Sequence, residues 1–299
     1  MKPLLLIAMT LAWTGLARGQ DYPVPTRPDS ATGIVYHDSG GSGDAVVLLH
    51  GLGSNIKFWR ETLPALEGFR VIAVDLPGHG RSRKENVDLS MSGVAASVAL
   101  LLDRLGVERA HLLGHSMGGQ IAIHLALSHP ALVNRLVLLA PAGIETFTDP
   151  QADMLKAYFT PELTCSATDE AVRTSIRMNV ADWSADFEWI VQDRLAFRGT
   201  PDFDAYCRAV SAFVAAMLDG PVRSRLGEIA PPVLVIGGEA DGLIPNRLLN
   251  PGTPEAVFAA GVAGMRDAQL VMIPRAGHLV QLEAPQAVNR AIVEFLAGR

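Results

Sequence analysis

The sequence lacks the features that mark several classes of protein. It has no run of lysine or arginine and a formal net charge of −6, so it offers no basic surface for nucleic acid. It contains no P-loop, no His-Glu-x-x-His zinc motif, no Cys-x-x-Cys pair and no internal repeat. These absences argue against a nucleotide-binding, zinc-dependent or repeat protein, and we expect no metal site.

Hydrophobic residues, by contrast, are plentiful. They make up 49% of the 299 residues, whereas charged residues account for 19%. This balance is typical of a globular protein with a substantial core rather than of a disordered chain. The length suits one large domain or a domain that carries an insertion.

The N-terminus has the features of a secretory signal peptide. Met1-Lys2 is followed by an almost wholly apolar stretch over 3–16, and Ala17-Arg18-Gly19 places small residues at both recognition positions of a cleavage site. The apolar stretch is too short to span a bilayer comfortably. We therefore interpret 1–19 as a signal peptide cleaved after Gly19, which predicts a secreted or periplasmic protein. The alternative is an uncleaved N-terminus that tethers the protein to a membrane. The proline-rich residues 20–32 are expected to form a tether before the fold.

The chain has only two cysteines, Cys165 and Cys207. In an oxidising compartment they could form one disulfide that closes a loop of about 40 residues and stabilises the fold by roughly 3 to 4 kcal/mol. The alternative is a pair of buried free thiols.

Apolar segments typical of buried strands alternate with segments typical of helices. Strands are expected at 33–37, 45–50, 70–75, 110–113, 135–140, 232–237 and 269–273. Helices are expected at 56–66, with Ser54 or Asn55 as its N-cap, and at 90–105, 120–127 and 285–296. This alternation predicts an α/β fold with a mostly parallel, doubly wound sheet. The glycine-rich segment 40–43 is expected to form a hairpin turn between the first two strands.

The alternation stops after Pro141. No strand pattern occurs from about 144 to 226, and three segments there are typical of amphipathic helices: 169–179, 186–197 and 202–218. We interpret residues 146–226, called the cap below, as a helical insertion between two parts of one core, 33–145 and 227–299. Apolar side chains of the cap are candidates for a substrate pocket, with a place in the cap's own core as the alternative: Met154, Leu155, Phe159, Trp183, Phe187, Trp189, Phe197 and Phe213.

The most informative motif is Gly114-His115-Ser116-Met117-Gly118, between an expected strand and an expected helix. In this G-x-S-x-G pattern the serine occupies a sharp turn, whose strained backbone leaves no room for bulky residues two positions away. The N-terminus of the following helix favours developing negative charge. The pattern predicts that Ser116 is a nucleophile; the alternative is an ordinary glycine-rich loop.

A serine hydroxyl needs a base that takes its proton and an acid that orients the base. His278 follows the last expected strand and Asp241 follows the preceding one, which gives the chain order Ser, Asp, His that accompanies this pattern. Glu239 and Asp149 are the competing acids. Other histidines are expected to be structural: His111, His115 and His124.

The negative charge of a tetrahedral intermediate needs N–H donors that are fixed in advance. Met117, directly after the serine, offers one backbone N–H. Leu52, in the segment His50-Gly51-Leu52-Gly53 after an early strand, offers a second. The alternative for this segment is an ordinary glycine-rich turn.

Together these motifs resemble those of the α/β-hydrolase superfamily. The segments that carry the resemblance are 50–53, 75–82, 114–118, 241–245 and 277–278, in the order found in that family. The resemblance covers 33–145 and 227–298. It implies an α/β-hydrolase fold with a cap, a Ser116–Asp241–His278 triad, hydrolysis of carboxylic esters through an acyl-enzyme, and no metal or organic cofactor.

Within the superfamily, 116–118 and 140–144 look closest to bacterial lipases and monoacylglycerol-lipase-like esterases. The serine nucleophile departs from the dehalogenase and epoxide-hydrolase branches, which have an aspartate at this position. We expect a small-molecule ester or a lipid as substrate, with transient contact to a lipid interface.

Several alternatives share the triad. They are an aminopeptidase or amidase, a carbon–carbon bond hydrolase of aromatic ring-cleavage products, and a perhydrolase-type haloperoxidase. Export disfavours the ring-cleavage role, which belongs to cytoplasmic catabolism. The alternative from another class is a catalytically silent binding protein on the same fold.

Overall fold

The computed structural model describes residues 21–298, so the predicted signal peptide, residues 1–19, lies outside the described residues. Within them the chain forms one sheet of eight strands in the order β1-β2-β4-β3-β5-β6-β7-β8. The strands are β1 (Arg27–Pro28), β2 (Val35–Asp38), β3 (Ala45–Leu49), β4 (Arg70–Asp75), β5 (Ala110–His115), β6 (Val133–Leu139), β7 (Val233–Gly238) and β8 (Ala268–Ile273). From β4 to β8 neighbouring strands are parallel, whereas β1 and β2 are antiparallel to their neighbours. The predicted mostly parallel sheet is confirmed.

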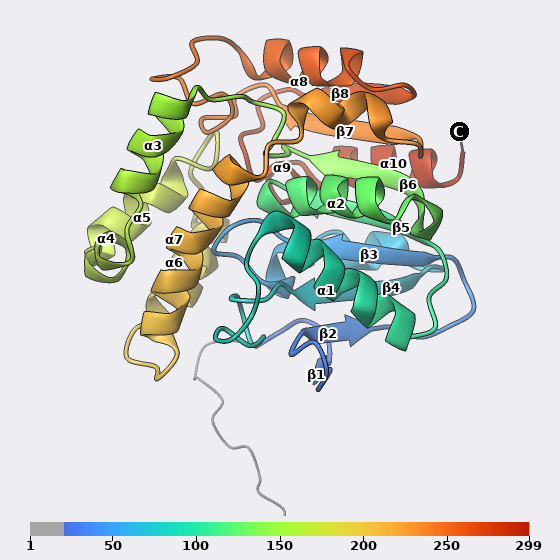
Figure 1. Cartoon of the computed structure of the whole chain (residues 1–299), viewed down its shortest axis with the longest axis horizontal. Helices are drawn as coiled ribbons and strands as arrows, with labels where there is room; N and C mark the ends of the chain where they lie inside the picture. The colour runs from blue at the N-terminus through green and yellow to red at the C-terminus, as the bar shows by residue number, and fades with distance from the viewer. Residues whose placement is uncertain (1–20, 299) are drawn as a thin grey trace, which may run out of the picture.

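Helices cover both faces of this sheet (Figure 1). One face carries α1 (Met91–Arg104), α2 (Met117–Ser128) and α8 (Pro254–Ala263), and the other carries α9 (Val280–Glu283) and α10 (Pro285–Leu296). Every residue of β3 is buried because its side chains alternate between the two apolar cores, as expected of a strand covered on both faces. The doubly wound architecture is thus built from the continuous apolar runs of the central strands.

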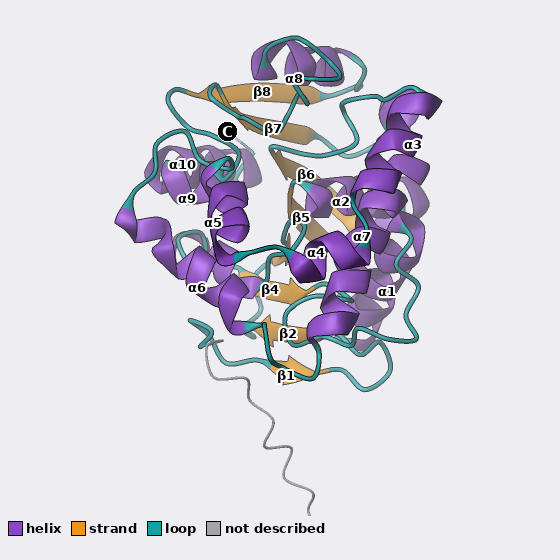
Figure 2. Ribbon diagram, turned by 90° about the vertical axis from the view of Figure 1, so that its left-hand side faces the viewer, coloured by secondary structure: helices purple, strands orange, loops and turns teal. Residues whose placement is uncertain are grey.

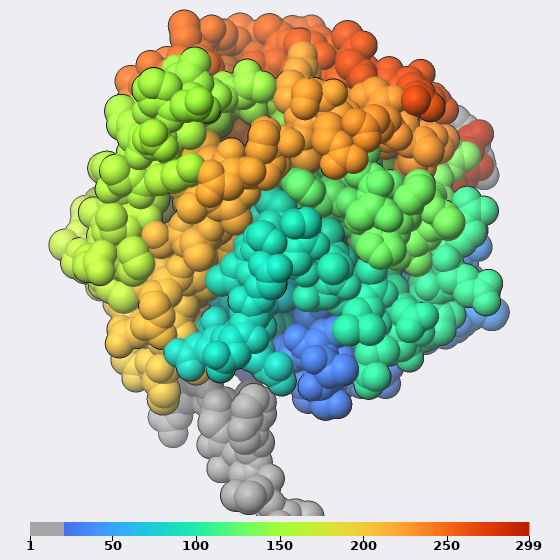
Figure 3. Space-filling model, in the orientation of Figure 1, coloured from blue at the N-terminus to red at the C-terminus, as the bar shows by residue number. Residues whose placement is uncertain are grey.

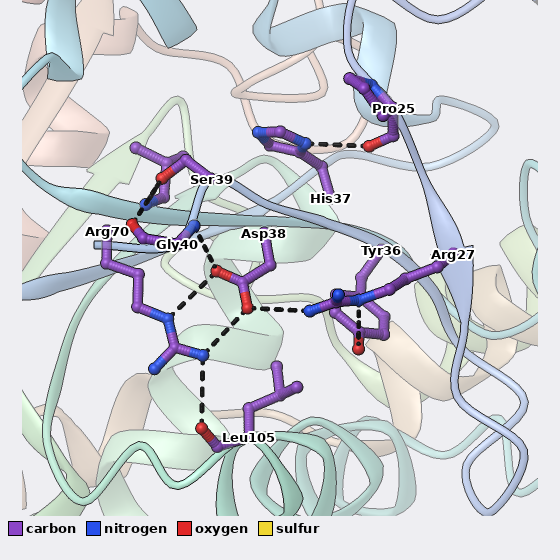
Figure 4. A network of polar contacts seen from close by, with 10 residues as sticks. Pro25, Arg27, Tyr36, His37, Asp38, Ser39, Gly40, Arg70 and Leu105 are labelled. Carbon is purple, nitrogen blue, oxygen red and sulfur yellow. Dashed lines mark hydrogen bonds and ion pairs between the residues drawn. The ribbon is translucent and has the colours of Figure 1, made fainter. Parts of the chain in front are cut away.

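The hairpin predicted at 40–43 is wrong. β2 pairs antiparallel with β4 and not with β3, so this segment carries the chain past β4 to the middle of the sheet. Asp38, the last residue of β2, fixes the point where the chain leaves this strand. Its carboxylate accepts hydrogen bonds from the guanidinium of Arg70 (2.9 and 3.1 Å), from Arg27 (3.2 Å) and from the Gly40 N–H (2.9 Å) (Figure 4). The wholly buried β3 takes a central place, whereas β2, with its half-buried polar end, lies nearer the edge.

The single helix predicted at 56–66 is also wrong. The structure has two short 3₁₀ helices there, η1 (Ile56–Trp59) and η2 (Leu63–Leu66). Pro64 lies at the start of η2, and proline disfavours helical backbone in the residue before it and removes one N–H donor. Of the two N-cap candidates, Asn55 caps η1 by accepting the Lys57 N–H.

The cap contains only helical elements. Between β6 and β7 lie α3 (Asp149–Tyr158), α4 (Pro161–Ser166), α5 (Asp169–Arg177), η4 (Ala185–Phe187), α6 (Glu188–Ala196) and α7 (Phe203–Asp219). A short 3₁₀ helix precedes each of the two strands: η3 (Pro130–Leu132) comes before β6, and η5 (Arg223–Glu228) comes before β7. The structure has helices at the three predicted places, and α3 and α4 in addition. These helices gather over one end of the sheet (Figure 2), and the space-filling view shows them packed against the core (Figure 3).

A disulfide between Cys165 and Cys207 joins α4 to α7 inside the cap, with a Cα–Cα distance of 5.6 Å. Neither α3 nor α4 contains a fully buried residue, and the disulfide joins this part of the cap to α7 together with the Lys156–Asp219 ion pair and the hydrogen bond from Ser211 to the Phe159 carbonyl. Within residues 21–298, none of the helices has the length and apolar character needed to cross a membrane.

Candidate active site

Ser116 lies in the sharp turn between β5 and α2. Its backbone has φ +52°, a conformation that side-chain-bearing residues rarely adopt. A Cβ atom on Gly114 would collide with the Gly118 carbonyl, and one on Gly118 would collide with the Leu49 carbonyl of β3. Both glycines of the motif are therefore required by space, as the sequence pattern predicts.

Three side chains from distant segments meet in one chain of hydrogen bonds. His278 Nε2 lies 2.9 Å from Ser116 Oγ, and His278 Nδ1 lies 2.9 Å from Asp241 Oδ2. The loop after β7 supplies Asp241 and the loop after β8 supplies His278, so both lie beside Ser116 at the carboxyl ends of the parallel strands. The competing acids Glu239 and Asp149 are exposed, and the acid that bonds His278 is Asp241.

The environment of Asp241 favours its ionised form. Burial alone would raise its pKa, but His278 and the backbone N–H groups of Ile244 and Leu243 outweigh burial and hold the pKa of Asp241 below its usual value. The carboxylate oxygen Oδ1 accepts both N–H groups, at 3.0 and 2.8 Å, which leaves Oδ2 for the imidazole. Because a carboxylate can only accept, His278 carries its proton on Nδ1 and presents Nε2 to the serine as an acceptor.

Two backbone N–H groups beside the serine are available to a ligand. Neither Leu52 nor Met117 has a hydrogen-bond acceptor for its N–H among the described residues. Gly51 lies against the serine, since a Cβ built on it would be 3.2 Å from Ser116 Cβ and 2.8 Å from His115 Nδ1. A side chain at position 51, directly before Leu52, would therefore collide with His115 and Ser116, and this position requires glycine.

Two buried histidines, to which the sequence assigned no role, hold the loop of residues 50–54, called the oxyanion loop below after the role predicted for Leu52. His50 Nε2 accepts the Leu76 N–H (3.0 Å), so its proton is on Nδ1 and is donated to the Gly51 carbonyl (2.8 Å). That carbonyl and the Leu52 N–H belong to the same peptide group, so His50 fixes the direction of the N–H. His79 Nε2 accepts the Gly53 N–H (2.9 Å). The signal was present in the resemblance, because His79 lies in the matched segment 75–82.

His115 is part of the scaffold, as expected. It is buried, and burial lowers the pKa of its imidazole to about 3, so the ring is neutral. Its Nε2 lies 2.9 Å from the His278 carbonyl oxygen and supports the loop that carries the base. From the cap side, the Asn179 carbonyl accepts the N–H groups of His278 (2.8 Å) and Leu279 (3.1 Å).

The candidate pocket residues of the cap lie in three different environments. Met154 and Phe159 lie at the surface, 52% and 37% exposed. Trp183 and Phe187 are partly buried in an apolar cluster that also contains Leu279, next to the base. Phe213 is fully buried against His79 and belongs to the main core. Among residues 21–298, no group of three or more His, Cys, Asp or Glu side chains is arranged to hold a metal ion.

A model of the alpha/beta hydrolase family matches residues 46–291, which is most of the chain. The chain belongs to the alpha/beta hydrolase family. A 2-hydroxy-6-oxononadienedioate/2-hydroxy-6-oxononatrienedioate hydrolase from Comamonas testosteroni is 32% identical to this hydrolase, over 88% of this chain and 91% of the relative. A dihydrolipoyllysine-residue acetyltransferase component of an acetoin cleaving system from Pseudomonas putida is also 32% identical, over 86% of this chain; the hydrolase spans 64% of that relative's length.

Solved structures agree on the fold. A probable hydrolytic enzyme from Pseudomonas aeruginosa PAO1 superposes with a TM-score of 0.78 and 28% identity, covering 92% of this chain and 95% of that chain. An esterase from Exiguobacterium antarcticum superposes with a TM-score of 0.74, covering 88% of this chain and 95% of that chain. Its 22% identity supports the shared fold alone.

Proposed function

We propose that this hydrolase cleaves carboxylic esters through a covalent acyl-enzyme, with Ser116 as nucleophile, His278 as base and Asp241 as the acid that orients the base. The observation that carries the proposal is the hydrogen-bonded chain Ser116–His278–Asp241 at a strained turn. An imidazole that accepts at Nε2 can take the serine proton as Oγ attacks the ester carbonyl. The buried carboxylate then stabilises the imidazolium that forms.

The oxyanion of the tetrahedral intermediate would be held by the N–H groups of Leu52 and Met117. Both are free of other acceptors within the described residues, and Met117 also begins α2, whose N-terminal dipole favours negative charge. Collapse of the intermediate expels the alcohol, which takes its proton from His278. Water then attacks the acyl-enzyme by the same route and releases the acid, so the cycle needs no cofactor.

A second candidate is hydrolysis of a carbon–carbon bond next to a carbonyl. It is favoured by the relative from Comamonas testosteroni, whose name describes a hydrolase of a 2-hydroxy-6-oxo dienedioate. The same triad could serve either reaction, because each reaction requires either nucleophilic attack on a carbonyl carbon or proton transfer close to a carbonyl group. The predicted export of this chain favours the ester.

A substrate panel tests the proposal. The purified protein is assayed with a chain-length series of p-nitrophenyl esters, with amino-acid anilides and with a vinylogous diketone of the ring-cleavage type. We expect turnover of the esters, and loss of that turnover in a Ser116→Ala variant. Ser128→Ala, at the other end of α2, is the matched control and should retain full activity, since its hydroxyl bonds only neighbouring helix carbonyls and His129. Turnover of the diketone with no ester hydrolysis would replace the first candidate by the second.

The remaining sequence predictions belong to the same proposal. We propose that residues 1–19 direct export, which N-terminal sequencing of the mature protein would test by a start at Gln20. We propose that the cap forms the acyl pocket and touches lipid interfaces transiently. Adding micelles to the ester assay tests this, and an unchanged rate with long-chain esters would contradict it.

A further inference from the structure

One helix of the cap binds the segment that follows β3. Arg194 of α6 donates from Nη2 to the Gly53 carbonyl at 2.7 Å. The preceding residue, Asp193, accepts the Asn55 side-chain N–H at 2.7 Å and forms an ion pair with Lys57 at 2.7 Å. Two consecutive cap residues therefore hold Gly53, Asn55 and Lys57, every second residue after the oxyanion donor.

The Arg194 contact completes a set of bonds along the oxyanion loop. His50 holds the carbonyl of the peptide that contains the Leu52 N–H, and His79 holds the Gly53 N–H of the next peptide. Arg194 holds the Gly53 carbonyl of the peptide after that. Three successive peptide groups are thus fixed by side chains, and the third of these side chains comes from the cap.

The guanidinium lies directly against the loop. Gly53 has φ +67°, and a Cβ atom built on it would lie within 2.9 Å of the guanidinium carbon of Arg194. The same group lies 5.7 Å from the centre of the buried Tyr206 ring. Arg194 has no carboxylate partner among residues 21–298, so its charge is directed to a backbone carbonyl. Charge-assisted hydrogen bonds of this kind are stronger than neutral ones and fix geometry more tightly.

We propose that Arg194 is a positioning residue for the reaction: it holds the oxyanion loop from the cap side, so that the Leu52 N–H points at the developing oxyanion. The inference rests on the proposed function, because it needs an oxyanion at Ser116. It implies that the oxyanion hole is fully formed only while α6 lies against the core. Its contribution is made in the transition state and should therefore appear in kcat rather than in KM.

The test uses Arg194→Met, which keeps the apolar stem but cannot donate a hydrogen bond. The matched control is Arg173→Met, because Arg173 forms an ion pair with Glu188 of the same helix and does not contact the oxyanion loop. We expect kcat for p-nitrophenyl acetate and butyrate to fall by about 10- to 100-fold in Arg194→Met, somewhat less than loss of a whole oxyanion donor, with KM changed by less than about twofold. Arg173→Met should match the wild type.

Two further readouts separate positioning from a purely structural role. The affinity for a trifluoromethyl ketone, which forms an oxyanion on Ser116, should fall by the same factor as kcat. In an Arg194→Ala variant, guanidinium added at concentrations below those that unfold the protein should restore part of kcat. A structural defect would lower stability in a circular dichroism melt and would not be rescued by guanidinium.

The outcomes are distinct from failure of the proposed function. If the wild type neither hydrolyses esters nor reacts with a fluorophosphonate at Ser116, the proposed function itself fails. If the wild type is active and Arg194→Met keeps its kcat, the positioning role is refuted. A loss confined to esters that carry a carboxylate, such as a hemisuccinate, would assign Arg194 to substrate binding and would also refute it.

Discussion

Asp241→Asn is the substitution for which the structure gives the most specific expectation. The carboxylate has two separate tasks: Oδ1 accepts the backbone N–H groups of Leu243 and Ile244, and Oδ2 accepts the Nδ1–H of His278. Asparagine has one oxygen. The two backbone N–H groups need this oxygen as their acceptor, at the position that Oδ1 occupies in the wild type. The amide nitrogen must therefore face the imidazole.

This orientation inverts the tautomer of the base. An amide NH₂ group donates, so His278 Nδ1 would have to accept, and the ring proton would move to Nε2. A protonated Nε2 cannot take the proton of Ser116, which lies 2.9 Å away. We therefore expect kcat to fall by about 10⁴-fold, equivalent to about 5 kcal/mol of transition-state stabilisation, with little change in KM.

The assay is steady-state hydrolysis of a p-nitrophenyl ester at neutral pH, with folding checked by circular dichroism. Glu239→Gln is the matched control, because Glu239 is one of the two competing acids, lies two residues away and is exposed. It should leave kcat unchanged. A kcat for Asp241→Asn within about tenfold of the wild type would refute the tautomer argument, and a large loss in Glu239→Gln would move the acid to that residue.

Three further predictions concern stability. Gly118→Ala should lower the free energy of unfolding by about 3 kcal/mol or prevent folding, because the added methyl meets the Leu49 carbonyl; a urea melt measures this, and an unchanged midpoint would contradict it. Reducing the cap disulfide, whose cysteines are 42 residues apart, should lower the free energy of unfolding by about 4 kcal/mol, which melts with and without reductant would show. The Arg70 hydrogen bonds hold the pKa of Asp38 below its ordinary 3.8, so the carboxylate stabilises the fold above that pH and loses its effect as the pH falls through its lower folded value. The stability gap between wild type and Asp38→Asn should therefore close below pH 3.8, and a gap that widens in acid would contradict it.

Features fixed by neighbours in the chain were predictable from the sequence. The apolar run of β3 indicated a strand buried on both faces, and the glycines around Ser116 indicated the strained turn. Chain order then placed Asp241 and His278 after successive strands, because parallel strands bring their carboxyl ends together. The structure places all three side chains in hydrogen-bond contact.

Features that depend on pairing between distant segments were not predictable in the same way. The hairpin predicted at 40–43 is wrong because no feature of the neighbouring sequence indicates that β2 pairs with β4 rather than with β3. The roles of His50 and His79 were missed because each bonds a residue 26 positions away. Which cap side chains line a pocket was also open, since an amphipathic pattern identifies an apolar face and not what that face contacts.

Two misses had local signals. Pro64 inside the expected helix at 56–66 argued for a break, which the structure has between η1 and η2. Thr148 and Gln151 form a capping box at the start of α3, a sequence pattern that marks a helix N-terminus. Both elements are therefore indicated by local sequence patterns, one by an internal proline and the other by a helix cap.

The most direct test of the central claim is the covalent intermediate itself. The wild type and the Ser116→Ala variant are mixed with p-nitrophenyl acetate, quenched in acid within the first turnovers, digested and analysed by peptide mass spectrometry. The account predicts a burst of nitrophenol and one added acetyl group on Ser116 of the wild type, and neither in the variant. Ester turnover without an acylated Ser116, or an acetyl group that accumulates on another residue at the rate of the burst, would contradict it.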